Sequence, residues 1–387
     1  MQRMTSLDTT RVLTEEIGAR GGATEEEHKA ADFISAELTR IGLTPEKQTF
    51  LGAVFAYGPY SLFAGLGLLS LVLFWQQQPV GAVAAAILTS AVLISIVLEL
   101  RFRTNPLRWL LPVDNSQNMI AHIPHAVAEQ GENSVQSLVI TTHLDVHRTV
   151  SAFDALGGMR LVSQALAAGI ASACLLLVLS VIGVFTPAVI LRQIALVPGV
   201  VLLVMLGVML LAERQQLAKG ADDTAGGVAT LLDLAQRLKQ APLARTDVTL
   251  VFTGSEEAGC YGAGAFFGSK DPELTGAIHI VLDRYGLAGA NPALVSAESF
   301  VVTTPSDPAL LALAAKVGAA HPELNVASLG PRPAHGELAV GAVYWLRGIE
   351  LSSSPVGPQP ASSGQIDEAA LARAQTFAWE FLLALDA

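Results

Sequence analysis

The sequence predicts an α/β domain, a three-layer sandwich with a mostly parallel central sheet, into which four transmembrane helices are inserted as two hairpins. Three observations lead to this fold class. The chain is 51% hydrophobic with a mean hydropathy of +0.48, which is too apolar for an ordinary soluble domain. Its longest apolar tracts contain no charged residue. The remaining segments alternate helical patterns with short apolar runs that suit buried strands.

Three tracts lack any charged side chain, and they are residues 51–98, 161–191 and 193–212. A helix needs roughly 20 apolar residues to cross a bilayer, so the first tract is long enough for two spans and the others for one each. We expect helices near 54–75, 80–98, 166–188 and 194–212, with Arg192 between the last two. The alternative, a large soluble core with buried helices, fits charge-free tracts of this length poorly.

The charged residues lie almost entirely in three other segments, which we expect to form one discontinuous domain: 1–50, 101–160 and 213–387. Two hairpins, 51–100 and 161–212, would interrupt this domain. The domain would therefore fold from segments that are far apart in the sequence.

Helices and strands alternate within the predicted domain. Thr24–Ile41 has apolar residues at helical spacing and acidic residues in its first turn, and a last helix is expected near 367–385. Four short apolar runs suit strands: Gln117–Ile123, Ser137–Thr142, Asp247–Thr253 and Ala277–Leu282. Runs that are apolar on both faces are typical of buried parallel strands, so the alternation favours a mostly parallel sheet between layers of helices.

Histidine and aspartate side chains follow two of these strands. His143 and Asp145 stand just past the strand in LVITTHLDVHRT, and Asp283 ends another strand in IVLDRYG. His-x-Asp is common by chance, so each motif alone is a weak signal. Because the strand ends of an α/β sheet converge on one edge, where such folds bind ligands, the motifs together indicate a site at that edge.

Adjacent acidic residues occur at two further places. Glu256 and Glu257 follow a strand in VFTGSEEAGC, and Asp222 and Asp223 stand in the Gly-rich turn GADDTAGG that opens a helix. Paired carboxylates that lose hydration repel each other, so the glutamates either lie in a solvated turn or face a cation. Histidine, aspartate and glutamate are zinc-type ligands, and a carboxylate-rich set can bridge two metal ions.

The order HLD, GADDTAGG, EEAG and LD resembles the aminopeptidase family of co-catalytic zinc peptidases, which includes aminopeptidase S, aminopeptidase Y and glutamate carboxypeptidase. The likeness covers the whole globular part, from the helix region at 18–42 to residues 366–367 before the last helix. It implies the zinc-peptidase, phosphorylase/hydrolase-like fold and a site that holds two zinc ions.

The resemblance also implies a role for each motif residue. His143 and Asp283 are expected to bind one zinc, Asp223 to bridge the two ions, and Glu257 to bind the other. Glu256 corresponds to the general base. The two glutamates would then divide the work, one holding metal and one taking a proton.

Two aspartates have supporting roles in this interpretation. Asp145 would orient His143 through the second ring nitrogen, as outer carboxylates do at metal sites. For Asp222 we favour a helix N-cap or turn residue over a ligand.

The last ligand is a histidine in this family, usually in Ser-Asp-His before a Gly-Ile-Pro turn. Here the sequence is PRPAHGELAVGAVYWLRGIELS, so His335 follows Pro-Ala, and Glu350 stands where the proline is expected. His321 is the other downstream candidate, but it lies at an expected helix end where a solvated role fits better. We therefore choose His335.

The function implied is amide hydrolysis at peptide N-termini by metal-activated water. Glutaminyl cyclases share the fold with one zinc but lack the first histidine, which is His143 here. A catalytically inactive membrane scaffold, like the peptidase-like subunit of the GPI transamidase, is the main alternative. A transporter built on the four spans is the second alternative, but the expected spans contain no ionisable residue.

The even number of spans in each hairpin places every globular segment on the same side as the N-terminus. Cytoplasmic flanks are enriched in Lys and Arg, so the catalytic domain should face the cytoplasm. Basic residues flank the spans on that side: Arg40, Lys47, Arg101, Arg103, Arg108, Arg148, Arg160, Arg214 and Lys219. The hairpin tips offer only Arg192. The absence of a recognisable signal peptide and of paired cysteines agrees with this side.

The partners follow from the same reasoning. The second hairpin is inserted between His143 and Asp223, so we expect a site near the bilayer and a peptide or membrane-proximal protein as substrate. Beyond the lipid bilayer no further partner is indicated, and nucleic acid is not expected. The sequence leaves the oligomeric state open.

Overall fold

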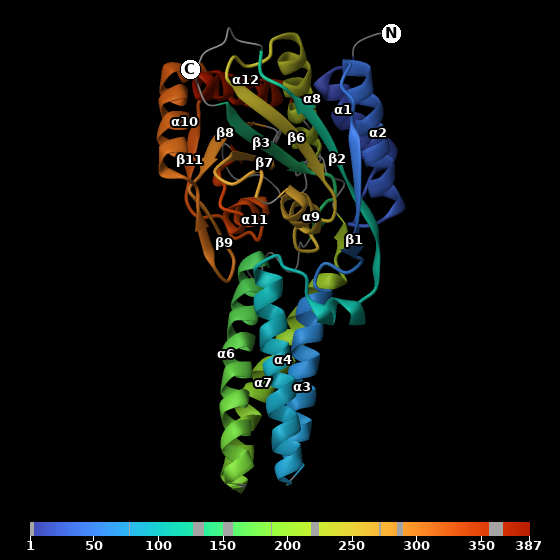
Figure 1. Ribbon diagram of the computed structural model, residues 1–387, viewed down its shortest axis with the longest axis vertical. Coiled ribbons are helices and arrows are strands. Elements are labelled where there is room, and N and C mark those ends of the chain that lie inside the picture. Colours follow the sequence, from blue (N-terminus) through green and yellow to red (C-terminus); the bar gives the residue numbers. More distant parts are fainter. Residues whose placement is uncertain are drawn as a thin grey trace. The chain divides into compact units, whose positions relative to one another are not determined.

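The computed structural model describes residues 4–76, 78–126, 135–149, 158–186, 188–217, 224–270, 272–284, 289–355 and 367–387. The chain forms two compact units (Figure 1). The first, which we call the α/β unit, contains residues 1–54, 113–147 and 217–387. The second, which we call the helical unit, contains residues 55–112 and 148–216.

The α/β unit is built on an eight-stranded sheet in the order β1-β2-β6-β3-β7-β12-β8-β11. Four of its seven pairings are parallel, and the other three, β1 with β2, β2 with β6, and β12 with β8, are antiparallel. The strands are β1 (Glu46–Ala53), β2 (Val113–Ile123), β3 (Gln136–His143), β6 (Thr246–Thr253), β7 (Ile278–Leu282), β8 (Ala290–Val295), β11 (Ala327–Leu329) and β12 (Arg347–Pro355). The structure thus confirms a mixed α/β fold with a large, mostly parallel sheet, and the four strands expected from the sequence are present.

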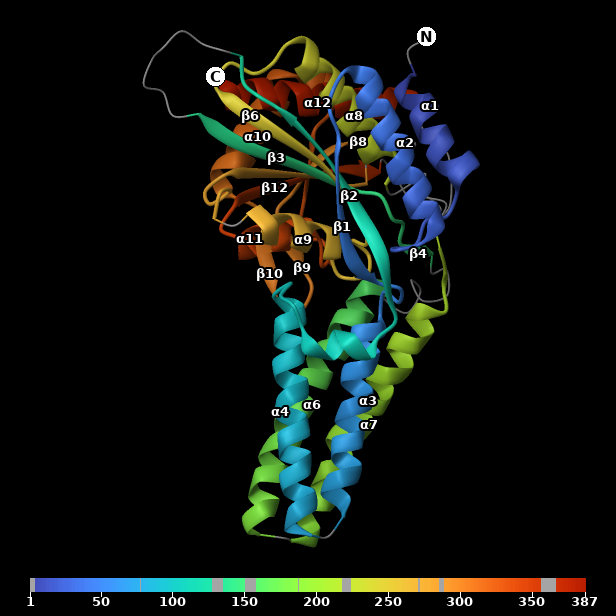
Figure 2. The same ribbon diagram turned by 45° about the vertical axis from the view of Figure 1, so that its right-hand side comes forward.

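Helices cover both faces of this sheet (Figure 2). On one face lie α1 (Ser6–Arg11), α2 (Glu25–Ile41), α8 (Ala225–Gln240), α10 (Pro308–Ala320) and α12 (Glu368–Asp386). On the other face α9 (Tyr261–Lys270) contacts β1 and β2, and α11 (Glu337–Val343) contacts β7 and β12. The shorter elements are η1 (Val12–Ile17), η2 (Pro106–Leu110), η3 (Pro322–Leu324), β4 (Arg148–Thr149), β5 (Gln216–Leu217), β9 (Ala297–Ser299) and β10 (Thr303–Pro305).

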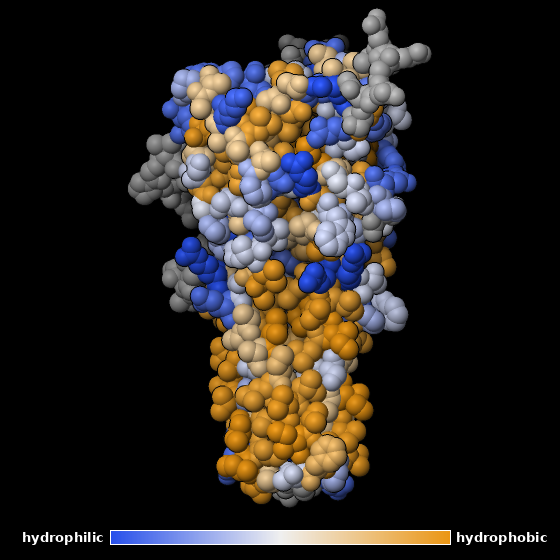
Figure 3. All heavy atoms as spheres, turned by 60° about the vertical axis from the view of Figure 1, so that its left-hand side comes forward, coloured by the Kyte–Doolittle hydropathy of each residue, from blue (hydrophilic) through white to orange (hydrophobic). Residues whose placement is uncertain are grey.

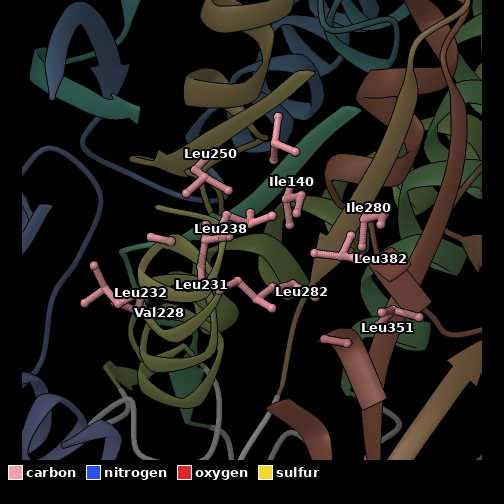
Figure 4. Packing of buried hydrophobic residues seen from close by; sticks show 14 of the residues in the cluster. Ile140, Val228, Leu231, Leu232, Leu238, Leu250, Ile280, Leu282, Leu351 and Leu382 are labelled. Carbon is pink, nitrogen blue, oxygen red and sulfur yellow. The ribbon is translucent and has the colours of Figure 1, made fainter. Parts of the chain in front are cut away.

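The main hydrophobic core lies between the sheet and the α8 side of the unit (Figure 4). It includes Leu138 and Ile140 of β3 and Ile278 and Ile280 of β7, together with apolar side chains of α2, α8, α10 and α12. Successive side chains of a strand point to opposite faces. Alternation therefore turns the odd-numbered side chains of these strands away from this core, and His143 is one of them.

Local sequence explains why α2 begins and ends where it does. Thr24 caps its N-terminus by accepting the N–H of Glu27, and three glutamates in the first turn complement the helix dipole. Gly42 ends the helix in a left-handed conformation (φ 88°), which glycine adopts without strain. The predicted helix at Thr24–Ile41 is thereby confirmed.

The helical unit is a bundle of four helices that contact one another: α3 (Gly58–Trp75), α4 (Pro79–Leu100), α6 (Gly158–Phe185) and α7 (Val189–Glu213). Small residues let them approach closely, since a Cβ at Gly169 would lie 2.2 Å from the sulfur of Met205. Apolar side chains cover the outside of these helices in the view of Figure 3. By length and composition all four could cross a membrane.

The helix limits differ from those expected in the second hairpin. The third helix begins at Gly158 rather than near 166, and the fourth begins at Val189 rather than near 194. Arg192, expected between the helices, lies in the first turn of α7 with 9% of its surface exposed. The helix α6 ends at Phe185, and Thr186 precedes a proline in the sequence, a position that disfavours the helical conformation. The charge-free tracts therefore predicted the apolar segments but did not predict the position of the turn between α6 and α7.

Candidate metal centre

The structure brings four of the predicted site residues together at the carboxyl ends of β3, β6 and β7. Nε2 of His143 lies 3.3 Å from Oδ1 of Asp283, and Nδ1 lies 3.8 Å from Oε2 of Glu256. Potential ligand atoms of His143, Glu256 and Glu257 all lie within 4.8 Å of one another. His143 is buried, so its imidazole faces the carboxylates in a poorly hydrated place.

Asp145 holds the backbone of the glutamate pair. One carboxylate oxygen accepts the N–H of Glu256 at 2.9 Å, and the other accepts the N–H of Glu257 at 3.0 Å. The nearest approach of Asp145 to Nδ1 of His143 is 3.7 Å, which is longer than a hydrogen bond. The observed hydrogen bonds of Asp145 therefore position the glutamates, a role that the sequence analysis did not foresee.

The turn before the glutamates is fixed in the same way by buried side chains from other elements. The N–H of Gly254 donates to Oδ1 of Asn118 at 3.2 Å, and the N–H of Ser255 donates to Oε1 of Glu27 at 2.6 Å. The hydroxyl of Ser116 donates to the other oxygen of Glu27. Ser255 has a φ of 51°, a strained value for a residue with a side chain. Acceptors from α2, β2 and the loop after β3 thus hold four successive backbone amides, from Gly254 to Glu257.

The electrostatics of the site favour a cation. Burial raises the pKa of Glu256 well above its ordinary value, and the charges of Glu257, Asp145 and Glu337 raise it further, while His143 lowers it. Burial also raises the pKa of Glu337 to about 7. Several carboxylates thus share a poorly solvated space with one imidazole, and a divalent cation would neutralise them. The residue types are those that bind zinc, so the residues present fit the metal.

His335 reaches the edge of this cluster through the loop before α11. The thiol of Cys260 donates to the His335 carbonyl at 3.1 Å, and its sulfur lies 3.6 Å from Oε1 of Glu256. The imidazole of His335 stacks on Phe300, with 5.0 Å between ring centroids. Burial lowers the pKa of His335 to about 4, so its ring is neutral near pH 7, the form that binds metals. Its role as the last ligand stays a prediction.

Asp223 and Asp222 lie outside the described residues. The residues just after them are placed: Thr224 accepts a hydrogen bond at 2.7 Å from the fully buried guanidinium of Arg20. A Cβ at Gly227 would lie 2.5 Å from the hydroxyl of Thr142 and 3.0 Å from the carbonyl of Leu282. The start of α8 therefore packs directly on the ends of β3 and β7, next to His143 and Asp283.

Sequence reasoning missed a partly buried arginine, Arg332, that contacts Asp283. Nη1 of Arg332 contacts Oδ2 of Asp283, and Nε lies 3.0 Å from Oε1 of Glu350. Glu350 is fully buried within β12, where burial raises its pKa to about 8. A charged residue in the middle of a buried strand was the signal that could have indicated this contact.

Glu298 is a second buried carboxylate that the sequence analysis did not single out. Its side chain accepts the N–H groups of Gly336, Leu338 and Ala339 at 3.0–3.2 Å. These are backbone donors at the start of α11, which a carboxylate satisfies well. Glu298 thereby anchors the segment that follows His335.

The fold is similar to that of solved zinc aminopeptidase and glutaminyl cyclase structures. The structure of a leucine aminopeptidase precursor from Bacteroides thetaiotaomicron superposes with a TM-score of 0.53 at 11% identity, covering 99% of this chain and 98% of that one. A zinc aminopeptidase from Bacillus subtilis gives a TM-score of 0.53 at 12% identity, covering 99% and 95%. A glutaminyl cyclase from Porphyromonas gingivalis gives 0.52 at 14% identity, covering 98% of each chain.

The sequence comparison matched part of the chain. Residues 206–327 are similar to the model of Peptidase family M28. The matched segment includes the glutamate pair and Asp283. No curated protein sequence matched the chain. At these identities the solved structures show the fold alone, and they include a cyclase as well as peptidases.

Proposed function

We propose that the protein is a membrane-bound, zinc-dependent metallopeptidase of aminopeptidase type, which hydrolyses the peptide bond after an N-terminal residue. The observation that carries the proposal is the cluster of His143, Glu256 and Glu257, whose potential ligand atoms lie within 4.8 Å of one another. The family match and the aminopeptidase structures support a hydrolase.

The metal would be held by residues on both sides of this cluster. His143 and Asp283 would bind one zinc ion, Glu257 and His335 a second, and Asp223 would bridge them. Zinc at such a site supplies a Lewis acid for the scissile carbonyl and lowers the pKa of water toward neutrality. We propose two ions because the proposed ligands form two sets, one for each ion, which we call the two halves of the site.

Glu256 is the proposed general base. Its carboxylate lies beside His143 but is not needed as a ligand in this arrangement, so it is free to accept a proton. Oε of Glu256 takes the proton of the attacking water and delivers it to the leaving amine. Asp145 accepts the backbone N–H of Glu256 and so fixes the part of the turn from which this side chain extends. Proton transfer then needs no rearrangement of the turn.

Two other functions are favoured less. A glutaminyl cyclase has the same fold, as the Porphyromonas gingivalis structure illustrates. His143 beside Asp283 argues for the peptidase, because this pair provides the additional metal half. An inactive scaffold would have no use for a buried histidine surrounded by carboxylates, which is costly to maintain without a cation.

Metal analysis together with substrate assays tests the proposal. We expect the purified full-length protein to contain two zinc ions per chain and to release the first residue from aminoacyl test substrates. A chelator should abolish this activity, and added zinc should restore it, because the ligands alone do not polarise the carbonyl. A protein without metal would support the scaffold, and cyclisation of N-terminal glutamine without peptide hydrolysis would support the cyclase.

We further propose that α3, α4, α6 and α7 span a membrane and that the α/β unit and the N-terminus face the cytoplasm. Their lengths of 18, 22, 28 and 25 residues and their apolar composition support the spans, and the basic residues beside them support the side. The segment with α6 and α7 is inserted between His143 and Asp223 in the sequence. We therefore propose peptides or membrane-proximal proteins as substrates.

Reporter fusions test the side of the membrane. A phosphatase that is active only outside the cell should be inactive when fused after Ala387 and active when fused at Gln78, between α3 and α4. The reason is that both ends of each hairpin lie on one side and its tip on the other. The reverse pattern would place the catalytic unit outside.

A further inference from the structure

Arg332 lies between two buried carboxylates at the rim of the candidate metal centre. Nη1 of its guanidinium contacts Oδ2 of Asp283, and Nε lies 3.0 Å from Oε1 of Glu350. The side chain of Arg332 is 19% exposed, while those of Asp283 and Glu350 are 10% and 0% exposed. These contacts are thus made where water screens charge poorly, and each charge there strongly affects the others.

The backbone of Arg332 is fixed, so its side chain enters the site from a defined position. Its N–H donates to the carbonyl of Ala297 at 2.8 Å, and its carbonyl accepts the N–H of Ser299 at 2.7 Å. Both partners belong to β9. Glu350, the second partner of the guanidinium, is held in β12 between Val281 of β7 and Val295 of β8. The contact between Arg332 and Glu350 is therefore fixed by the backbone structure on both sides.

The two oxygens of Asp283 consequently face different groups. Oδ1 lies 3.3 Å from Nε2 of His143, on the side of the proposed metal ligands. Oδ2 is taken by the guanidinium of Arg332. The negative charge of this carboxylate is therefore shared with a cation that the chain itself supplies.

We propose that Arg332 is a positioning residue that competes with the metal ion for Asp283, and that Glu350 limits this competition by drawing the guanidinium to itself. The proposal rests on the metal site put forward under the proposed function. According to the proposal, the half of the site with His143 and Asp283 binds metal less tightly than it would without Arg332. The other half has no such competitor in this proposal.

Opposite effects of the two partners follow from their charges. Without the guanidinium, Asp283 offers its full negative charge to a cation, so zinc binds this half more tightly. Without the Glu350 carboxylate, the arginine keeps its charge and has lost one of its two carboxylate contacts. Its hold on Asp283 then strengthens, and zinc binds more weakly. Glu350 acts only through Arg332, so its effect should disappear when the arginine is absent.

A double-mutant cycle on the purified full-length protein tests this dependence. Zinc affinity is measured by competition with a chromophoric chelator for wild type, Arg332→Met, Glu350→Met and the double variant. Methionine has a similar size to both side chains and leaves no new polar group. Asp283→Asn identifies which binding step belongs to this half of the site, because it should lose that step.

We expect Arg332→Met to bind zinc at least about tenfold more tightly in that step, which corresponds to about 1.4 kcal/mol. Glu350→Met should bind at least about tenfold more weakly, by the same conversion. The double variant should match Arg332→Met within roughly threefold, since the effects of contacting residues are not additive. Each single variant leaves one charged side chain without its partner, whereas the double variant removes both charges. The double variant therefore provides the test even if a single variant does not fold.

Other results would overturn the proposal. Unchanged or weaker binding by Arg332→Met, or by the double variant where the single one does not fold, would show that the guanidinium does not compete with the metal. A double variant that binds as weakly as Glu350→Met would show that Glu350 acts without Arg332. A wild type that binds no zinc would overturn the proposed function together with this inference. A wild type that binds zinc and hydrolyses peptides, with variants of unchanged affinity, would overturn only the inference.

Discussion

Glu256→Gln should lower the rate of peptide hydrolysis by roughly 100- to 10,000-fold, the range typical of a general base, while the zinc content stays nearly unchanged. The amide of glutamine has the shape of the carboxylate but does not accept the proton of the attacking water. The N–H of residue 256 would still donate to Asp145, so the turn should keep its conformation. Rates on aminoacyl test substrates and metal analysis of the same preparation measure the two effects.

Glu257→Gln is the matched control for this prediction. It makes the same carboxylate-to-amide change at the adjacent residue of the same turn. The backbone N–H of residue 257 also donates to the carboxylate of Asp145. Because Glu257 is proposed as a ligand, this variant should lose zinc as well as activity. If Glu256→Gln keeps most of its activity, Glu256 is not the base. If the Glu256 variant loses the metal and the Glu257 variant keeps it, the two roles are exchanged.

Much of the α/β unit could be predicted because its signals are local. The strands that end at His143 and Asp283 are short apolar runs followed directly by polar residues, and parallel strands bring such ends to one edge. The structure places Nε2 of His143 3.3 Å from Oδ1 of Asp283, although 140 positions separate them in the sequence. The strand pattern predicted the fold class and a shared sheet edge, and the family resemblance paired His143 with Asp283.

The residues that support the site were not predictable in the same way. Arg332, Glu350 and Glu27 gain their roles from contacts with segments far along the chain, such as the bond from the Ser255 N–H to Glu27, 228 positions apart. No local pattern distinguishes these charges from those on a solvated face. Glu350 alone offered a hint, as a carboxylate within a buried strand.

The limits of the apolar helices show another boundary of sequence reasoning. A tract without charge predicts where the apolar surface begins. The helix itself can begin earlier and include a charged residue in its first turn. α6 includes Arg160 in its first turn, and α7 includes Arg192. Predicting the helix from the tract alone therefore set its start too late.

Asp145→Ala should weaken zinc binding by about 10- to 100-fold, as loss of an outer support typically does, and should lower the free energy of unfolding by about 2–5 kcal/mol. Asp145 is fully buried and accepts the N–H groups of both Glu256 and Glu257. Its removal leaves two buried donors without their acceptor and frees the turn that carries the base and a ligand. Zinc competition and denaturant unfolding measure the two losses.

Asp307→Ala is the matched control, because Asp307 also accepts two successive backbone N–H groups, those of Ala309 and Leu310 at 2.9 and 3.0 Å. It caps α10 near the surface, so its loss should cost about 1 kcal/mol of stability. Zinc affinity should not change, since this cap does not hold the glutamate turn. If the two variants lose similar stability and both keep wild-type zinc affinity, Asp145 is an ordinary structural acceptor. A loss of zinc affinity in Asp145→Ala alone would identify it as the residue that positions the glutamate pair.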